Sequence, residues 1–106
     1  MFLLVAALAV AGAVSARAED AKALYDGQCA KCHGPDGMGK TKMGEKLGVP
    51  DYTDAKVQDK MKDEEMAKAI KEGVTKDDKR LMKAFGDSLS DGDIKALVKY
   101  IRAFKK

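Results

Sequence analysis

Apolar residues near the C-terminus recur at the spacing of an α-helix. They stand at offsets of three, four, seven and ten from the first, which places them on one helical face. They are Ile94, Leu97, Val98, Ile101 and Phe104. The segment just before them, Ser90–Asp93, has the form of a capping box with Ser90 as the N-cap. The pattern therefore predicts an amphipathic helix at the end of the chain.

A first helix is predicted over about 21–30, with Asp20 as its N-cap. Its best core candidates are Leu24 and Tyr25. Residues 34–50 follow as a loop rich in glycine and other turn formers, with a short helical turn expected near Met43–Leu47. A loop of this length without a repeating apolar period usually has a function.

A middle helix is predicted over about 64–72, with Asp63 as its cap and Gly73 as its end. Its apolar face consists of residues one turn apart: Met66, Ile70 and Val74. Residues 75–89 then return to loop, opening with a run of charged side chains. No strand pattern is evident, so the fold class predicted is all-α, with three to five short helices.

The N-terminal segment is apolar and uncharged from residue 2 to residue 14. The sequence Ala16-Arg17-Ala18 then provides an A-x-A cleavage site, as in a secretory signal peptide. A retained membrane anchor is the alternative, but the run is shorter than the roughly 20 residues of a spanning helix. We therefore expect a cleaved signal at 1–18 and one domain at 19–106.

The composition argues against nucleic-acid binding and for a bound apolar group. Lys and Arg number 20 and Asp and Glu 17, a balance unlike the concentrated basic charge of a nucleic-acid binder. A chain this short, with three Phe, three Tyr and no Trp, builds only a marginal core. A large apolar cofactor would supply the missing buried surface.

The sequence Cys29-Ala30-Lys31-Cys32-His33 carries the most specific chemical signal. Two thiols at this spacing can add across the two vinyl groups of a haem, and the next residue then offers an imidazole nitrogen to the iron. His33 is the only histidine of the chain. The motif therefore predicts one covalently attached haem c, with His33 as an axial ligand.

Three other interpretations of this motif fit less well. A thiol–disulfide CxxC motif normally begins a helix in a βαβ unit, and no strand is predicted here. A zinc site needs about four ligands, so two cysteines and one histidine leave it one short unless a carboxylate joins. Buried structural cysteines would not explain the adjacent histidine.

The chain resembles the small class I mono-haem cytochromes c of bacterial periplasms. The resemblance covers essentially all of residues 19–106, and the segments that carry it lie at 24–34, 36–41, 82–90 and 94–102. The resemblance implies a class I cytochrome c fold, in which the first and last helices cross beside the haem. Tyr25 and Tyr100 would lie at or near that crossing. Ala21 stands where the family often has a glycine.

The sixth ligand of the iron would be a methionine sulfur. Six methionines are available, at positions 1, 38, 43, 61, 66 and 82. Met66 is interpreted as core filler, and Met38 and Met43 as loop residues packed against the haem. Met61 is not excluded by its pattern. Met82 lies where the resembling family places its ligand, although Lys83 follows it in place of the usual proline.

Axial ligation by His33 and Met82 leaves no open site on the iron, so we expect a soluble one-electron carrier and no enzyme. A peroxidase-like enzyme with a labile sixth site and a haem docking subunit of a larger respiratory complex are the alternatives. Basic residues gather in the segments around the motif and Met82: Lys31, Lys40, Lys42, Lys46, Lys79, Arg80 and Lys83. We expect a periplasmic monomer that meets redox donors and acceptors through their acidic surfaces, without stable insertion into a membrane.

Overall fold

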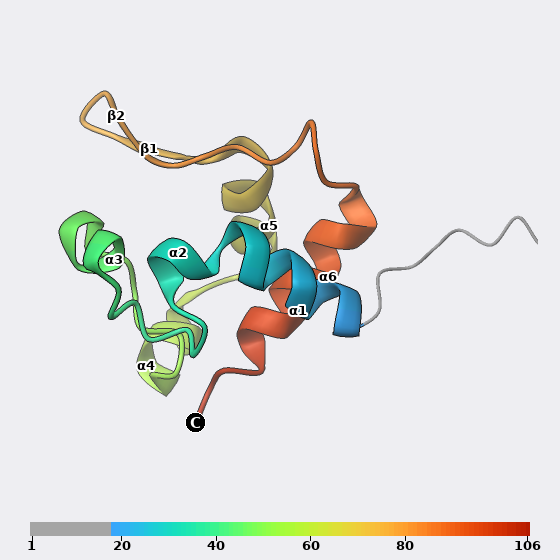
Figure 1. The fold of residues 1–106 in the computed structure, drawn as a ribbon, viewed down its shortest axis with the longest axis horizontal. Coiled ribbons are helices and arrows are strands. Elements are labelled where there is room, and N and C mark those ends of the chain that lie inside the picture. The colour runs from blue at the N-terminus through green and yellow to red at the C-terminus, as the bar shows by residue number, and fades with distance from the viewer. Residues whose placement is uncertain (1–17) are drawn as a thin grey trace, which may run out of the picture.

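A computed structural model describes residues 18–106, which form six helices and one two-stranded hairpin (Figure 1). The helices are α1 (Ala18–Gln28), α2 (Ala30–His33), α3 (Lys42–Leu47), α4 (Ala55–Lys60), α5 (Asp63–Glu72) and α6 (Asp91–Arg102). The strands are β1 (Val74–Lys76) and β2 (Lys79–Met82). The mainly helical architecture is as predicted, but the described residues form six helices where three to five were expected. Apart from Ala18, the predicted signal segment lies outside the described residues.

The first and last helices, α1 and α6, pack on each other, as the sequence led us to expect (Figure 1). Tyr25 is fully buried between them, with its ring centroid 5.1 Å from that of Tyr100 and 5.2 Å from that of Phe104. The Tyr25 hydroxyl donates a hydrogen bond to the carbonyl of Gly34 at 2.7 Å. Ala21 is also buried, so a small residue is retained near this contact.

The helix α6 has the predicted start and the predicted buried face. The Ser90 hydroxyl accepts from the Asp93 backbone N–H at 3.1 Å, and the Asp93 carboxylate accepts from the Ser90 N–H at 3.0 Å. Its buried residues are Ile94, Leu97, Val98 and Ile101. Phe104 lies just beyond the helix and packs against the core. The capping box and the apolar period were therefore both interpreted correctly.

Two of the predicted helix starts are wrong. The described part of α1 begins at Ala18, so Asp20 lies inside this helix and is not its N-cap. The N-cap of α5 is Lys62, without a side-chain bond, and Asp63 is the first helical residue. Asp63 still stands in the first turn, where the helix dipole favours a negative charge. The end of α5 at Gly73 is as predicted.

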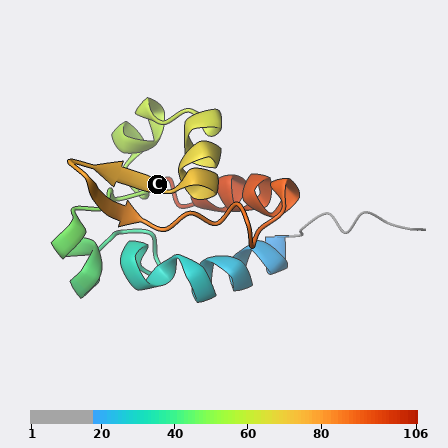
Figure 2. The same ribbon diagram turned by 90° about the horizontal axis from the view of Figure 1, so that it is seen from above.

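Part of the segment predicted as a loop, residues 75–89, forms the β1–β2 hairpin instead. The strands are antiparallel, with Val74 opposite Met82 and an irregular register between Val74 and Thr75. Asp77 and Asp78 at the turn have φ angles of 51° and 62°, the left-handed values that a two-residue hairpin turn requires. Figure 2 shows the hairpin with its turn directed away from α6. Val74 therefore belongs to a strand, and not to the apolar face of α5.

The helix α4 has no counterpart in the sequence prediction, because polar contacts anchor it. The side chain of Asp54 caps its first turn. Gln58 is 1% exposed, and its Nε2 donates to the carbonyls of Tyr52 at 2.7 Å and Ile101 at 2.9 Å. The Arg102 guanidinium donates to the Gln58 side-chain oxygen at 3.0 Å. A buried amide with both ends paired thus joins α4 to α6.

Candidate functional site

The two cysteines of the motif lie at the junction of α1 and α2. Cys29 connects the two helices and is 7% exposed, whereas Cys32 lies within α2 and is half-buried. Burial, with a smaller contribution from Cys32, raises the pKa of the Cys29 thiol to about 11. Both thiols are free rather than joined in a disulfide. The first helix, predicted to run to about residue 30, therefore ends at Gln28, and Cys32 lies in the separate short helix α2.

The motif borders a cleft with an inner and an outer part. The inner part has a volume of about 170 Å³, and the outer part about 550 Å³. Both parts share the same five lining residues, which are Cys29, His33, Tyr52, Ala69 and Met82. The inner wall is mainly apolar and includes Met61, Met66, Ile70 and Ile101. A cleft of this kind excludes water from a bound apolar group.

The environment of His33 favours a neutral imidazole. Burial lowers the pKa of His33, and the neutral form is the one that binds a metal. The ring stacks on Tyr52, with centroids 5.0 Å apart and an interplanar angle of 23°. Among residues 18–106, no hydrogen-bond partner is found for the buried Nδ1 atom of His33. In the described part of the chain, this ring nitrogen is therefore not bonded to a backbone carbonyl.

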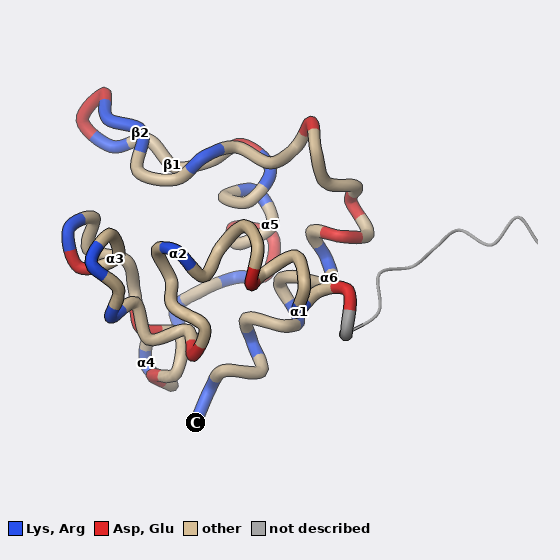
Figure 3. Tube along the Cα trace, in the orientation of Figure 1, with Lys and Arg blue, Asp and Glu red and all other residues tan. Residues whose placement is uncertain are grey.

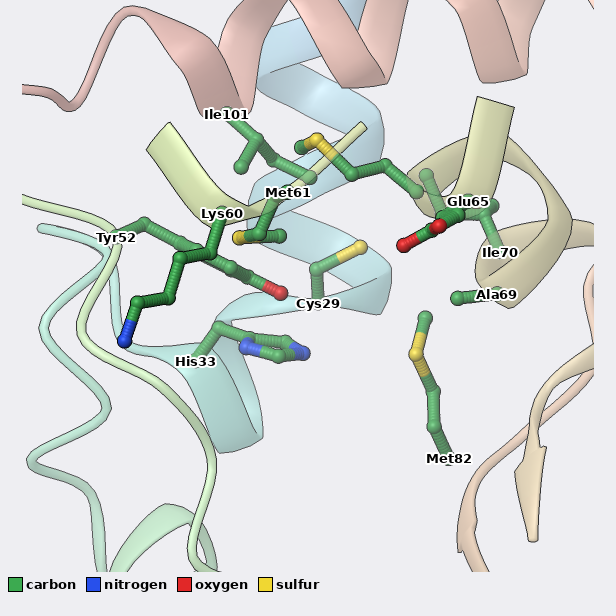
Figure 4. A pocket seen from close by; sticks show the side chains of 11 residues that line it. Cys29, His33, Tyr52, Lys60, Met61, Glu65, Ala69, Ile70, Met82 and Ile101 are labelled. Atoms are coloured by element: carbon green, nitrogen blue, oxygen red, sulfur yellow. The ribbon is translucent and has the colours of Figure 1, made fainter. Parts of the chain in front are cut away.

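Met82 lies across the cleft from His33. Figure 4 shows the His33 ring pointing into the open space toward Met82, which comes from the opposite wall at the end of β2. Met82 was expected in a loop and instead ends a strand. Met61 and Met66 also line the inner part of the cleft, and Met66 is buried in the core as predicted. Met43 is 37% exposed on α3 and lines neither part.

These residues fit a covalently bound haem. Two thiols, one half-buried imidazole and one thioether converge on a single, mainly apolar cleft, and this is the donor set that such a cofactor uses. The structure thus brings together Cys29, Cys32, His33 and Met82, the four site residues predicted from the sequence. It does not place Met38 or Met43 on this cleft.

A contact that was not predicted from the sequence supports the attachment helix α2. The Thr41 hydroxyl donates to the carbonyl of Cys32 at 2.8 Å and accepts from the backbone N–H of Gly44 at 2.8 Å. Gly44 lies so close to this carbonyl that a Cβ atom would stand 2.2 Å from the Cys32 oxygen. The helix α3 is therefore packed directly on the backbone of the motif. Thr41 before a short helical turn indicates an N-cap, but no local pattern indicates the contact of α3 with Cys32.

We expect Gly44→Ala to destabilise the protein, although alanine is the better helix former. The added methyl group meets backbone atoms that cannot move independently, and overpacking of this kind costs about 1–3 kcal/mol. Gly27 is the matched control, because it is also helical and a Cβ there meets nothing within 4 Å. Gly27→Ala should stabilise by roughly 0.5–1 kcal/mol. Denaturant unfolding measures both, and equal stabilisation would contradict the packing argument.

A second missed feature fixes the wall of the cleft near Met61. The Arg102 guanidinium donates to the carbonyls of Gln58, at 2.6 Å, and of Met61. It also pairs with Asp63 at 2.9 Å. One arginine of α6 therefore holds the connection between α4 and α5. Its contacts are long-range, so no local pattern could have indicated them.

Comparisons with known proteins identify the family of the chain. The family model described as "Cytochrome C oxidase, cbb3-type, subunit III" matches residues 16–101. The solved structure of the KustC0563 c-type cytochrome has a TM-score of 0.73 and 38% identity, over 81% of this chain and 98% of that one. A tyrosine-to-phenylalanine mutant of that cytochrome gives a TM-score of 0.71 and 37% identity, over 81% and 99%.

A search of curated proteins gave no match. The family match and the solved structures nevertheless cover most of residues 18–106, and membership of the cytochrome c family supports a covalently bound c-type haem and haem-based electron transfer. The described architecture agrees with these relatives and with the resemblance noted in the sequence. The chain therefore belongs to the family of this model and is a small mono-haem cytochrome c with the class I cytochrome c fold.

Proposed function

We propose that this protein is a soluble one-electron carrier with one haem c, bonded to Cys29 and Cys32 and ligated by His33 and Met82. The observation that carries the proposal is the arrangement in Figure 4, where His33 and Met82 face each other across an apolar cleft beside the motif. Bound there, the haem supplies an iron that changes its oxidation state by one electron.

The residues of the cleft have separate tasks in this proposal. Cys29 and Cys32 fix the cofactor to the junction of α1 and α2. His33 and Met82 would both hold the iron as neutral ligands, which would leave no site on it for a substrate. The thioether ligand favours the ferrous state. The apolar wall also favours it, because the higher charge of the ferric state is costlier in a low dielectric. These tasks suit electron transfer and not catalysis.

The charge around the cleft supports docking on acidic partners. Lys31 and Lys83 line the outer part of the cleft. Figure 3 shows further basic residues along α3 and on the hairpin, which lie on the same side of the molecule as α2. Asp77 and Asp78 at the hairpin tip interrupt this basic rim. We propose that the rim steers redox donors and acceptors with acidic surfaces toward the cleft.

The cellular location and the oligomeric state are also proposals. Residues 1–18 would direct export to the periplasm, and the domain at 19–106 would act there as a monomer. Within residues 18–106, no helix is both long and apolar enough to cross a membrane. The description of the family model also favours a second candidate, a haem docking subunit of a larger respiratory complex. Purification of the native protein, alone or with other subunits, distinguishes the two.

The test of the carrier function is a visible and near-infrared spectrum of the purified protein in both oxidation states. We expect one haem that remains attached after denaturation, a sulfur–iron charge-transfer band in the ferric state, and a single one-electron potentiometric transition. High-spin ferric iron with peroxidase activity would contradict the proposal and favour an enzyme with a labile sixth site.

A further inference from the structure

The chain that follows Met82 is bonded to the C-terminal end of α5. The last carbonyls of a helix have no partner within the helix and must find one elsewhere. The backbone N–H of Phe85 donates to the Ile70 carbonyl at 2.9 Å, and that of Gly86 donates to the Lys71 carbonyl at 3.0 Å. Two successive backbone groups thus tie this segment to α5. We call residues 80–86 the Met82 strap.

The chain that precedes Met82 is bonded to the same helix end through a side chain. Arg80 lies on β2, and its Nη1 donates to the Glu72 carbonyl at 2.9 Å. A cation is favoured at this position, because the C-terminal end of a helix carries partial negative charge. Met82 therefore lies between one hydrogen bond to α5 on its N-terminal side and two on its C-terminal side. The three acceptors are the successive carbonyls of residues 70–72.

The strap also runs directly over Gly73, the residue that ends α5. A Cβ atom on Gly73 would stand 2.5 Å from the Met82 carbonyl oxygen and 2.9 Å from the Ala84 nitrogen. Gly73 has φ 78° and ψ −177°, a conformation that is essentially restricted to glycine. Only a glycine therefore allows the backbone of Met82 to lie this close to the helix end.

The hairpin alone is a weak support for Met82. A two-stranded ribbon is at best marginally stable in water, and β1 and β2 are only three and four residues long. Its turn places Asp77 and Asp78 at left-handed φ values, which cost more for aspartate than for glycine. The contacts to α5 must therefore supply most of the restraint on the position of Met82.

We propose that Arg80 and Gly73 are positioning residues that hold Met82 at the cleft wall and disfavour its displacement from the iron. This inference rests on the proposed function, in which Met82 is the sixth ligand. Without the strap, the thioether would leave the iron more often, and an external ligand would take its place. The apparent affinity for such a ligand reports the population of the displaced state.

The test is a titration of the ferric holoprotein with imidazole, followed by loss of the sulfur–iron band. We expect Arg80→Ala to bind imidazole roughly tenfold more tightly, since it removes a charge-assisted hydrogen bond. Lys76→Ala is the matched control: it removes one positive charge from the same hairpin, and its side chain has no hydrogen bond or ion pair within residues 18–106. It should bind imidazole as the wild type does. Arg80→Lys should bind imidazole with an affinity between that of Arg80→Ala and that of the wild type.

A second variant tests the close approach of the strap to Gly73, where a Cβ atom would meet Arg80 Nη1 as well as the backbone of Met82 and Ala84. Gly73→Ala should also increase the imidazole affinity, because the new methyl group displaces the strap. Gly48→Ala is its control, since Gly48 also ends a helix with a positive φ, of 68°, but a Cβ there meets nothing within 4 Å. Circular dichroism confirms that each variant remains folded.

The results separate this inference from the function on which it rests. If Met82→Ala loses the sulfur–iron band but Arg80→Ala and Gly73→Ala bind imidazole like the wild type, the strap is not a positioning device. Equal gains in imidazole affinity in Arg80→Ala and Lys76→Ala would also overturn this inference, because the charge of the hairpin would then be the cause. If Met82→Ala keeps the band, the assignment of Met82 fails first.

Discussion

The double variant Cys29→Ala, Cys32→Ala is expected to be largely unfolded. It can no longer retain haem, and the apolar wall of the cleft then faces water. Each square ångström of apolar surface removed from water contributes about 25 cal/mol, so the loss of the cofactor removes a large part of the stabilisation. The free energy of unfolding of a small domain is only about 5–15 kcal/mol. A chain of this size has little margin for that loss.

Far-UV circular dichroism during thermal unfolding measures the effect. The double variant should show little helical signal and no cooperative transition. Lys31→Ala is the matched control, because it changes an exposed residue between the two thiols and leaves both of them in place. It should unfold cooperatively, as the wild type does. A native-like, cooperative helical signal from the double variant would show that the protein core is sufficient without haem.

The helices that the sequence predicted well are those whose signals are local. The helix α6 combines an apolar face with a capping box, and both are read from consecutive residues. The end of α5 at Gly73 is likewise a local backbone requirement. The predicted start of α5 was off by one residue, since Asp63 can act in the first turn as well as at the cap.

The elements that the sequence did not predict depend on distant partners. The helix α4 is anchored through Gln58, which is hydrogen-bonded to the backbone of α6. The sequence of α4 has no apolar period from which a helix could be predicted. The β1–β2 hairpin is short and highly charged, so its residues do not alternate between apolar and polar. Its turn uses two aspartates where glycine or asparagine would have been the usual signal.

The same division applies to the candidate site. Cys29, Cys32 and His33 form one continuous motif, so their chemistry was evident from the sequence. Met82 was assigned through resemblance, and the structure adds that it faces His33 from a strand end. The contacts of Arg80 with Glu72, and of Gly44 with Cys32, could not be predicted, because each joins two separate elements.

The variant Met82→Ala is expected to lose the sulfur–iron absorption of the ferric protein and to have a lower reduction potential. The thioether is a neutral ligand that favours ferrous iron, so its removal favours the ferric state. Axial ligands span roughly 0.8 V in haem proteins, and we expect a decrease on the order of 0.1 V or more. A decrease of about 59 mV corresponds to a tenfold change in the one-electron equilibrium.

Two other methionines serve as controls for this experiment. Met61→Ala changes a residue that lines the same cleft, and Met43→Ala changes an exposed residue of α3. Both variants should keep the sulfur–iron band, and Met61→Ala should lose stability because it opens a gap in the apolar wall. Spectra and potentiometric titration of all three variants measure these effects. If the band disappears in Met61→Ala and persists in Met82→Ala, then Met61 is the ligand, and the arrangement of His33 opposite Met82 does not determine ligation.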